Sequence, residues 1–381
     1  MSDSPLPQAR PATRITCCVH QRLASRAAEA LEAFGIPDVL VQSARCVRQQ
    51  AVPRPWPLPG MATSLNDSPT DIFRITCHRD VAITVMNGLI DAIELSASGR
   101  GSIYAQNIDD YGTSLTGLSS TALGSLGSKG KSGLLTDFAL ITAILSGAGN
   151  ENAFVRETLE LRAGAPIVSL GIGTGIRDRL GLLRITIPPE KEIVHLVVPA
   201  HDADGILRLL VETTHMDRPG GGFLYRTPVC FGRIDPMLRI GKPQHAASIE
   251  QIIAAVDDLK DGTAWRQRFR AADRQIARHE GMRLQHHYRE ITFICAEGGA
   301  DLLVQRAMQA GAGAATVSTV RRLRADARTE IDGAREIGTL IVPTRNADDI
   351  ASALLTTHVQ KPEIDLRLQT LDTQAVFSHQ R

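Results

Sequence analysis

The sequence predicts an α+β protein made of three repeats, each with the element order β-α-β-β-α-β. Three isoleucines lie in short apolar strands at comparable points of the chain: Ile15, Ile144 and Ile291. A glycine follows each of them after 20 residues (35 − 15 = 20 in the first case) and ends the intervening helix: Gly35, Gly164 and Gly311. Equal spacings of this kind are the sequence signature of an internal repeat.

The other elements of each repeat follow in a fixed order. Each helix has apolar residues at three- and four-residue steps, and a β-rich run comes after its terminal glycine. The third strand of each repeat then opens with an acidic residue: Asp71, Glu192 and Glu336. An amphipathic helix follows each of these strands. A glycine opens the last strand 30 residues later in two repeats: Gly101 (101 − 71 = 30) and Gly222 (222 − 192 = 30). This order predicts ferredoxin-like repeats, with four antiparallel strands and two helices on one face, that form a single-chain pseudo-trimer.

The repeat boundaries define the expected domains. They are a disordered N-terminus (1–12), repeat one (13–111), a Gly/Ser linker (112–133), repeat two (134–231), a helical connector (232–287) and a degenerate repeat three (288–381). The third repeat is called degenerate because it lacks the second glycine loop. The proline-bearing connection of repeat one, within residues 44–70, is expected to break the strand ladder and form an exposed arm.

Composition excludes some classes of function. The chain has 42 basic and 41 acidic residues, a net charge of +1, which does not indicate a nucleic-acid partner. No apolar run approaches the roughly 18 residues of a membrane span, and the polar start lacks a signal-peptide pattern. We therefore expect a protein that does not span the membrane and lies in the cytoplasm. Six cysteines without a C-x-x-C pattern are expected to be small buried side chains.

The middle repeat resembles the P-II family of signal-transduction proteins along roughly 95 residues. The stretches that carry the resemblance are RAGAPIVSLGIGTG (162–175), IPPEKEIVHLVVP (187–199) and RPGGGFLYRTPV (218–229), with a second local match at 307–322. The family implies ferredoxin-like subunits that form trimers and bind adenine nucleotides between subunits. It also implies a mobile loop that regulates another protein. This chain lacks the family's longer loop with a modified tyrosine.

The resemblance also places candidate nucleotide-binding residues. The expected residues at the base of the mobile loop and the following strand are Gly171, Gly173, Thr174, Gly175 and Lys191. The expected phosphate-side residues are Gly220, Gly221, Gly222, Gly99, Arg100 and Gly101, and two arginines after the last strand of repeat two are expected to reach a neighbouring cleft: Arg233 and Arg239. Clustered amides on glycine turns favour anions, which gives a physical reason for this choice. A plain turn at 171–175 remains an equal alternative, and a Rossmann motif does not fit because the pattern is not G-x-G-x-x-G.

No residues form a recognisable catalytic or metal-binding pattern, and His195 is expected to be a core or interface histidine. The first hypothesis is a non-catalytic regulator, without a prosthetic group, whose effector is ATP, ADP or AMP, with a small anion such as bicarbonate or a carboxylate as a further ligand. Its partner would be a transporter or a metabolic enzyme, and it would act as a monomeric pseudo-trimer or a higher assembly. The alternative is a structural scaffold with degenerate ligand sites. An enzyme is the third class considered.

Overall fold

The strands and helices are given by a computed structural model, which describes residues 8–36, 38–53, 61–112, 133–146, 150–175, 190–216, 222–240, 284–323 and 332–378. The first part of the chain contains β1 (Arg10–His20), α1 (Ala24–Ala33), β2 (Val39–Pro53), β3 (Met61–Cys77), α2 (Ala82–Ala92) and β4 (Gly101–Asp110). The second contains β5 (Leu135–Ser146), α4 (Asn150–Glu160), β6 (Ile167–Gly175), β7 (Glu190–Pro199), α5 (Ala203–Thr213), β8 (Phe223–Arg233) and the short β9 (Arg239–Ile240). The third contains β10 (Tyr288–Ala296), α8 (Ala300–Gln309), β11 (Ala314–Leu323), β12 (Asp332–Pro343), α9 (Thr344–Gln360), β13 (Arg367–Thr373) and β14 (Ala375–Ser378).

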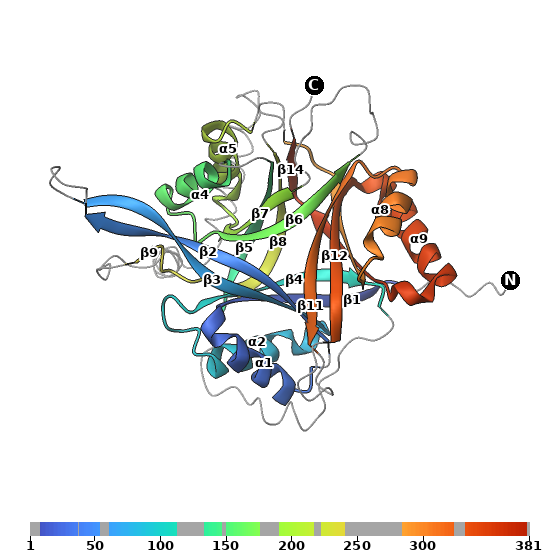
Figure 1. Cartoon of the computed structure of the whole chain (residues 1–381), viewed down its shortest axis with the longest axis horizontal. Helices are drawn as coiled ribbons and strands as arrows, with labels where there is room; N and C mark the ends of the chain where they lie inside the picture. Colours follow the sequence, from blue (N-terminus) through green and yellow to red (C-terminus); the bar gives the residue numbers. More distant parts are fainter. Residues whose placement is uncertain are drawn as a thin grey trace, which may run out of the picture.

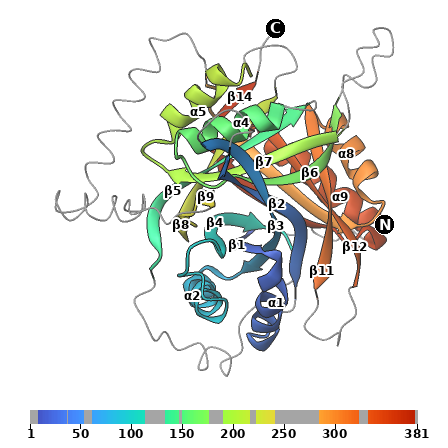
Figure 2. The same cartoon turned by 60° about the vertical axis from the view of Figure 1, so that its left-hand side comes forward.

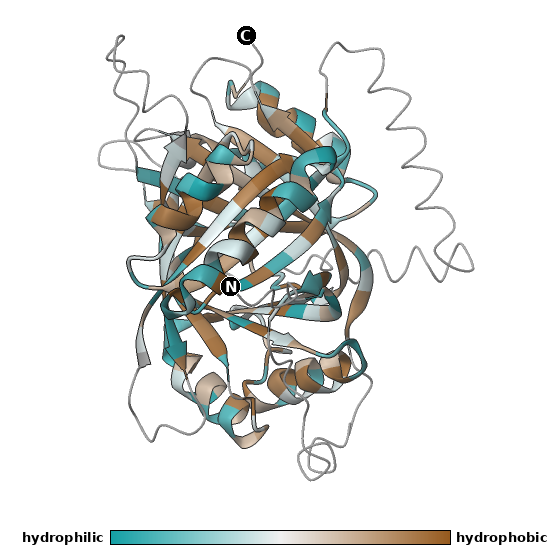
Figure 3. Cartoon of the chain, turned by 90° about the vertical axis from the view of Figure 1, so that its right-hand side faces the viewer, coloured by the Kyte–Doolittle hydropathy of each residue, from teal (hydrophilic) through white to brown (hydrophobic). Residues whose placement is uncertain are grey.

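The helices end near the glycines that the sequence marks. Gly35 and Gly311 follow α1 and α8 with φ angles of 71° and 103°, the positive range that a residue with a β-carbon rarely adopts. Each helix buries one face: Ala27 and Leu31 of α1 are buried, whereas its remaining residues are partly or fully exposed. Hydrophobic and hydrophilic residues are accordingly mixed along the helices in Figure 3. The glycine spacing therefore predicts these two helix ends correctly.

Strands of all three parts form one sheet that closes into an antiparallel β-barrel, and the short β9 joins the sheet by pairing in parallel with β2 (Figures 1 and 2). The hydrogen-bonded order is β14-β8-β5-β7-β6-β11-β12-β10-β13-β4-β1-β3-β2-β9, and further pairings join β8 to β4, β6 to β2 and β11 to β2. The predicted fold, three ferredoxin-like repeats forming a pseudo-trimer, is wrong. Although each part keeps the order strand, helix, strand, strand, helix, strand, the outer strands of each part pair with strands of the others. Each set of four strands therefore joins the other two sets through its outer strands.

Both faces of the barrel strands are buried, and this explains their long apolar runs. In β1, Ile15, Cys17 and Val19 belong to a core that includes buried residues of α1 and α2. The alternate residue Cys18 packs on the inner side with Tyr104, Phe138, Leu140 and other side chains. Similar helix-covered cores lie over the second and third parts of the chain. The inner side also carries polar side chains, and these build the candidate site described below.

A long hairpin projects from the barrel. Strands β2 and β3 pair continuously from Val39↔Ile75 to Pro53↔Met61, and the hairpin extends away from the body at the left of Figure 1. The expectation that prolines break this ladder is wrong for residues 44–53 and 61–70. The ladder tolerates Pro53 because it is the last paired residue of β2, where a missing amide hydrogen costs little.

Other predicted segments differ in outcome. Strand β1 begins at Arg10, inside the stretch 1–12 that was expected to be disordered. Most of the predicted linker (113–132) and connector (241–283) lies outside the described residues. Five cysteines are buried and Cys230 is half-buried, which confirms the interpretation of cysteines as mostly internal side chains. Within the described ranges, no helix has both the length and the apolar character that crossing a bilayer requires.

Candidate functional site

A polar cavity of about 90 Å³ lies between the first and third parts of the chain. This volume is several times the ~10–15 Å³ that one water molecule needs. Five arginines line it, and they come from five strands: Arg14, Arg74, Arg322, Arg335 and Arg367. Two carboxylates, Asp38 and Asp365, also lie in the wall.

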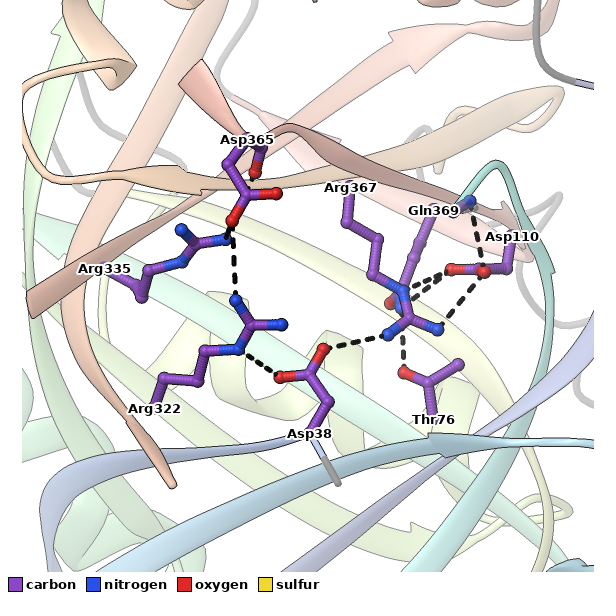
Figure 4. A network of polar contacts seen from close by, with 9 residues as sticks. Asp38, Thr76, Asp110, Arg322, Arg335, Asp365, Arg367 and Gln369 are labelled. Atoms are coloured by element: carbon purple, nitrogen blue, oxygen red, sulfur yellow. Dashed lines mark hydrogen bonds and ion pairs between the residues drawn. The ribbon is translucent and has the colours of Figure 1, made fainter. Parts of the chain in front are cut away.

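The outer part of this arginine cavity is a chain of ion pairs of alternating sign (Figure 4). Arg335 contacts Asp365 at 2.7 Å, and Asp365 also lies 3.4 Å from Arg322. Arg322 donates from Nε to Asp38 at 2.7 Å, and the other oxygen of Asp38 lies 3.3 Å from Arg367. Asp38 therefore bridges an arginine of β11 and an arginine of β13.

Arg367 completes the chain by binding a fully buried carboxylate. It donates from Nε and Nη2 to the two oxygens of Asp110, at 2.8 and 3.2 Å. Asp110 is 0% exposed, so this two-point contact holds an otherwise costly buried charge. Gln369 donates to the same carboxylate at 3.3 Å and to Thr76 at 2.9 Å.

Local backbone geometry sets the position of Asp365. This residue follows a 3-10 turn, Pro362–Ile364, and adopts a left-handed conformation with φ of 47°. Burial raises the pKa of Asp365, but Arg335 and Arg322 outweigh that effect, so the net shift is below the ordinary value. The carboxylate is therefore ionised at neutral pH and acts as a counter-charge for both arginines.

The inner end of the cavity holds a buried ion pair that crosses between β1 and β10. Arg14 donates to Glu290 at 2.7 Å and to Gln106 at 2.9 Å, and its other nitrogen donates to Thr292 at 3.3 Å. The Arg14 and Glu290 side chains are 10% and 5% exposed. Burial lowers the pKa of Arg14, but the attraction of Glu290 outweighs it and the net shift is upward.

Arg74 differs from the other four arginines because no carboxylate of the described residues pairs with it. Its guanidinium donates to the neutral amide oxygen of Gln42 at 2.7 Å. Burial is the largest effect on Arg74 and lowers its pKa, and the positive charge of Arg14 lowers it further. An arginine remains protonated in proteins even so. Arg74 is therefore a charged group in the cavity wall that forms no ion pair with a carboxylate of the described residues.

The charge count shows what the cavity can bind. Five arginines face four carboxylates (Asp38, Asp365, Asp110 and Glu290), so the group carries 5 − 4 = +1. Guanidinium groups bind carboxylate and phosphate oxygens through two parallel hydrogen bonds. The arrangement is thus suited to hold an anion. The described residues contain no group of three metal-ligating side chains.

The predicted loop at Gly171–Gly175 is a strand instead. Residues Ile167–Gly175 form β6, which pairs with β7 through Gly171↔Lys191 and with β11 through Gly173↔Thr316. The stem of Lys191 lies against Gly173, and Thr174 donates to the carbonyl of Ala315 at 3.4 Å. The backbone amides here serve the ladder, so this stretch is a strand and not a loop, and a nucleotide-binding role for its residues stays a prediction.

The remaining predicted residues lie in other places. Gly220 and Gly221, and the side chain of Arg239, lie outside what the structure describes. Gly222 directly precedes β8, and a β-carbon added to it would lie 2.8 Å from the carbonyl oxygen of Ile144. Arg233 donates to the carbonyls of Leu95, Ser96 and Gly133. The structure therefore describes only part of the predicted set, whose nucleotide-binding role stays a prediction.

Gly99, Arg100 and Gly101 lie near a second, smaller pocket of about 10 Å³. The amide of Gly99 donates to Asp235 at 2.9 Å, and Asp235 also pairs with Arg48 at 2.7 Å. Arg100 pairs with Glu94 at 3.0 Å. The space is about that of one water molecule. The carboxylate of Asp235 thus already accepts a hydrogen bond from the Gly99 amide, which was expected to contact a phosphate.

Gly101 has a structural role that predicts a clear loss of stability on substitution. Its φ is 142°, and an added β-carbon would lie 2.0 Å from the Cys18 carbonyl oxygen of the paired strand. Gly101→Ala should lower the free energy of unfolding by about 1–3 kcal/mol, because neither backbone can move away cheaply. Urea unfolding measures the change.

The control for Gly101 is Gly205→Ala in α5, where nothing lies within 4 Å of the added carbon. That change should stabilise the protein by about 0.5–1 kcal/mol, since alanine favours helix. Equal stability of Gly101→Ala and the wild type would contradict the structural role.

The arginine cavity was missed by the sequence analysis. One available signal was a charged residue at the start of an apolar strand, as in RITCCV (Arg14) and EITFIC (Glu290). A second was the basic run RRLRADAR, whose first residues end β11 and include Arg322. Neither signal names a partner, because the ion pairs made by Asp38, Asp110 and Glu290 join residues 257 to 329 positions apart.

Comparisons with known proteins do not assign the chain to a family. No protein-family model and no curated protein matches it. Among solved structures, an aspartate kinase from Synechocystis matches with 10% identity and a TM-score of 0.22, covering 96% of this chain. The match spans 44% of the kinase chain, and a likeness this distant carries no argument. The resemblance to P-II proteins stays a prediction that none of these comparisons tests.

Proposed function

We propose that this protein is a non-catalytic regulator that binds a small organic or inorganic anion in the arginine cavity. The observation that carries the proposal is the charge of the arginine cluster: the five cavity-lining arginines are matched by four carboxylates, two in the wall and two behind it, and among the described residues no carboxylate pairs with Arg74. A guanidinium held in a partly dehydrated site gains more from an anion than one in water, because the local dielectric constant is lower. The most suitable ligand carries a carboxylate or phosphate group.

Binding would alter the existing ion pairs rather than simply add to them. An anion that reaches Arg322 or Arg367 competes with Asp38, which holds both of them. An anion near Arg335 competes with Asp365. The ligand therefore favours a state in which one of these aspartates is released.

Asp38 gives the cavity a physical connection to the projecting hairpin. It directly precedes β2, whose other end is the outer part of the hairpin, and β3 contributes Arg74 and Thr76 to the cavity wall. A shift of Asp38 thus acts at the root of the hairpin. We assign the hairpin the role of contacting a partner protein, with the occupancy of the cavity as the signal.

Isothermal titration calorimetry tests this function with orthophosphate, succinate, citrate, ATP, ADP and AMP as probes. At least one should bind with a dissociation constant below about 1 mM. Arg335→Met should weaken that binding by about 10- to 100-fold, as expected for loss of charged hydrogen bonds. Amide hydrogen exchange along β2 should change when the ligand is added.

The matched control is Arg26→Met, which removes an exposed arginine that pairs with Glu94 far from the cavity. Its affinity should equal that of the wild type. Absence of binding by every probe would refute the proposal. If a probe binds but amide hydrogen exchange along β2 does not change, the anion site is supported and the role of the hairpin is refuted.

A scaffold remains the second candidate, and exposed apolar side chains on β6 support it. Leu170 and Ile172 lie two residues apart on one face of this strand and are 68% and 55% exposed. Surfaces of this kind often contact other proteins. In the titration experiment, a pure scaffold would bind none of the probes.

A further inference from the structure

A line of polar side chains crosses the inside of the barrel on four neighbouring strands. Strand β3 carries Arg74, β2 carries Gln42, β6 carries Ser169 and β7 carries His195. The strands are neighbours in this order, because β3 pairs with β2, Ala44 of β2 pairs with Ser169, and Ile167 of β6 pairs with His195. We call these four residues the buried polar strip.

Part of the strip has no hydrogen-bond partner in the described structure. Ser169 is 2% exposed and its hydroxyl is unpartnered, and both ring nitrogens of His195 are buried and unpartnered. Buried polar groups are nearly always hydrogen-bonded, so such orphans point to a bound water molecule or ion. The two side chains lie on the same inner face, since Ser169 and Ile167 are two residues apart on one strand.

The electrostatic field along the strip is positive. Arg74 donates to Gln42 and pairs with no carboxylate of the described residues, whereas Arg14 nearby is balanced by Glu290 at 2.7 Å. The interior thus has one uncompensated positive charge, 2 − 1 = +1 for Arg14, Arg74 and Glu290. Burial and the charges of Arg74 and Arg14 lower the pKa of His195 to about 3. At neutral pH the ring is uncharged and keeps one N–H donor.

We propose that the buried polar strip binds a small monoanion, a halide or a small oxyanion, inside the barrel. Arg74 supplies the charge, and the Ser169 hydroxyl and one His195 N–H supply hydrogen bonds. The ion enters through the arginine cavity, since Arg74 lines that cavity as well. Apolar neighbours such as Leu140 and Ile167 limit the ligand to a small size.

This site goes beyond the proposed regulatory function and shares only Arg74 with the arginine cavity. The outer ion-pair chain contains Arg322, Arg335 and Arg367, none of which belongs to the strip. The strip in turn contains Ser169 and His195, which do not line the cavity. Variants of the two groups therefore separate the two proposals.

Anomalous diffraction from crystals of the full chain grown with sodium bromide locates the ion directly. A bromide peak should lie within about 3.5 Å of the Arg74 guanidinium and of a His195 ring nitrogen or the Ser169 hydroxyl. An ordered water molecule in that place, with no anomalous peak, would overturn the proposal. A peak only at surface side chains would do the same.

A solution experiment tests whether the site is specific. Thermal unfolding is followed against sodium bromide and sodium nitrate, with sodium gluconate keeping the ionic strength constant. The wild-type melting temperature should rise and saturate. Ser169→Ala should raise the half-saturation concentration by about tenfold, a loss of one charge-assisted hydrogen bond. His195→Phe, which fills the same space without a donor, should also weaken saturation while remaining folded.

Arg335→Met separates this result from the regulatory proposal. That variant should keep the bromide response, because Arg335 is not part of the strip, although it weakens binding in the outer cavity. Loss of the response in Arg335→Met but not in Ser169→Ala would place the ion in the outer cavity and refute the interior site.

Discussion

Glu290→Gln is expected to lower the free energy of unfolding by about 3–5 kcal/mol, the usual cost of breaking a buried ion pair from one side. Glu290 is 5% exposed at its side chain and lies 2.7 Å from Arg14. The substitution removes the negative charge and leaves the Arg14 guanidinium buried beside Arg74, which also lacks a carboxylate partner. Urea unfolding, followed by circular dichroism, measures the loss.

Two further variants serve as the control and as the rescue for Glu290→Gln. Glu94→Gln, in an exposed pair with Arg26, should change stability by no more than about 0.5 kcal/mol. The double variant Arg14→Met with Glu290→Leu should recover much of the lost stability, because no unpaired charge stays inside. If Glu290→Gln is as stable as Glu94→Gln, the Arg14–Glu290 pair is not buried in solution.

His195 is expected to make the protein unstable in acid, with a slope of up to about 1.4 kcal/mol per pH unit. Burial and the charges of Arg74 and Arg14 lower the pKa of the folded-state ring to about 3, whereas the unfolded value is ordinary at 6.5. Below pH 6.5 the unfolded chain therefore takes up a proton that the folded chain cannot. Stability is fully present above pH 6.5 and is lost as the pH falls toward 3.

Urea unfolding between pH 3.5 and 7.5 measures this dependence. The matched variant is His195→Phe, which cannot bind the proton and should show a smaller acid slope than the wild type. His286→Phe serves as the control, since His286 is exposed on the surface. The same slope in His195→Phe and the wild type would mean that His195 is not buried uncharged. Anions that occupy the strip should be absent from the buffers.

Much of the local structure could be predicted from the sequence, whereas the joining of the strands could not. The spacing of Ile15 to Gly35 and of Ile291 to Gly311 correctly predicts a strand followed by a helix that ends near the glycine. Apolar runs such as ITCCV do not say which strand pairs with which, because a strand buried on both faces has no polar side to orient it. The sequence therefore does not predict that β2 pairs with β6 and β11, as it does in the structure.

The candidate site was beyond prediction for a related reason. Asp38, Arg322 and Arg367 each read as ordinary surface charges, since charged residues are mostly exposed. They meet only because three strand ends converge, over separations of up to 329 residues. At residues 171–175 the error was instead a predicted loop where the structure has a strand. Their G-x-G-x-G pattern indicated a ligand loop, but glycine also suits a strand that another strand approaches closely, as β11 approaches β6.

The bridge made by Asp38 has a consequence for how the protein is synthesised. A ribosome releases Asp38 early, but its partners Arg322 and Arg367 follow 284 and 329 residues later. Until β13 emerges, Asp38 lacks its second arginine and the proposed anion site is incomplete. A chain truncated before Arg367 should be unable to sense the anion, however well its earlier strands fold. Under the proposed function, ligand binding therefore requires a chain that is complete through Arg367.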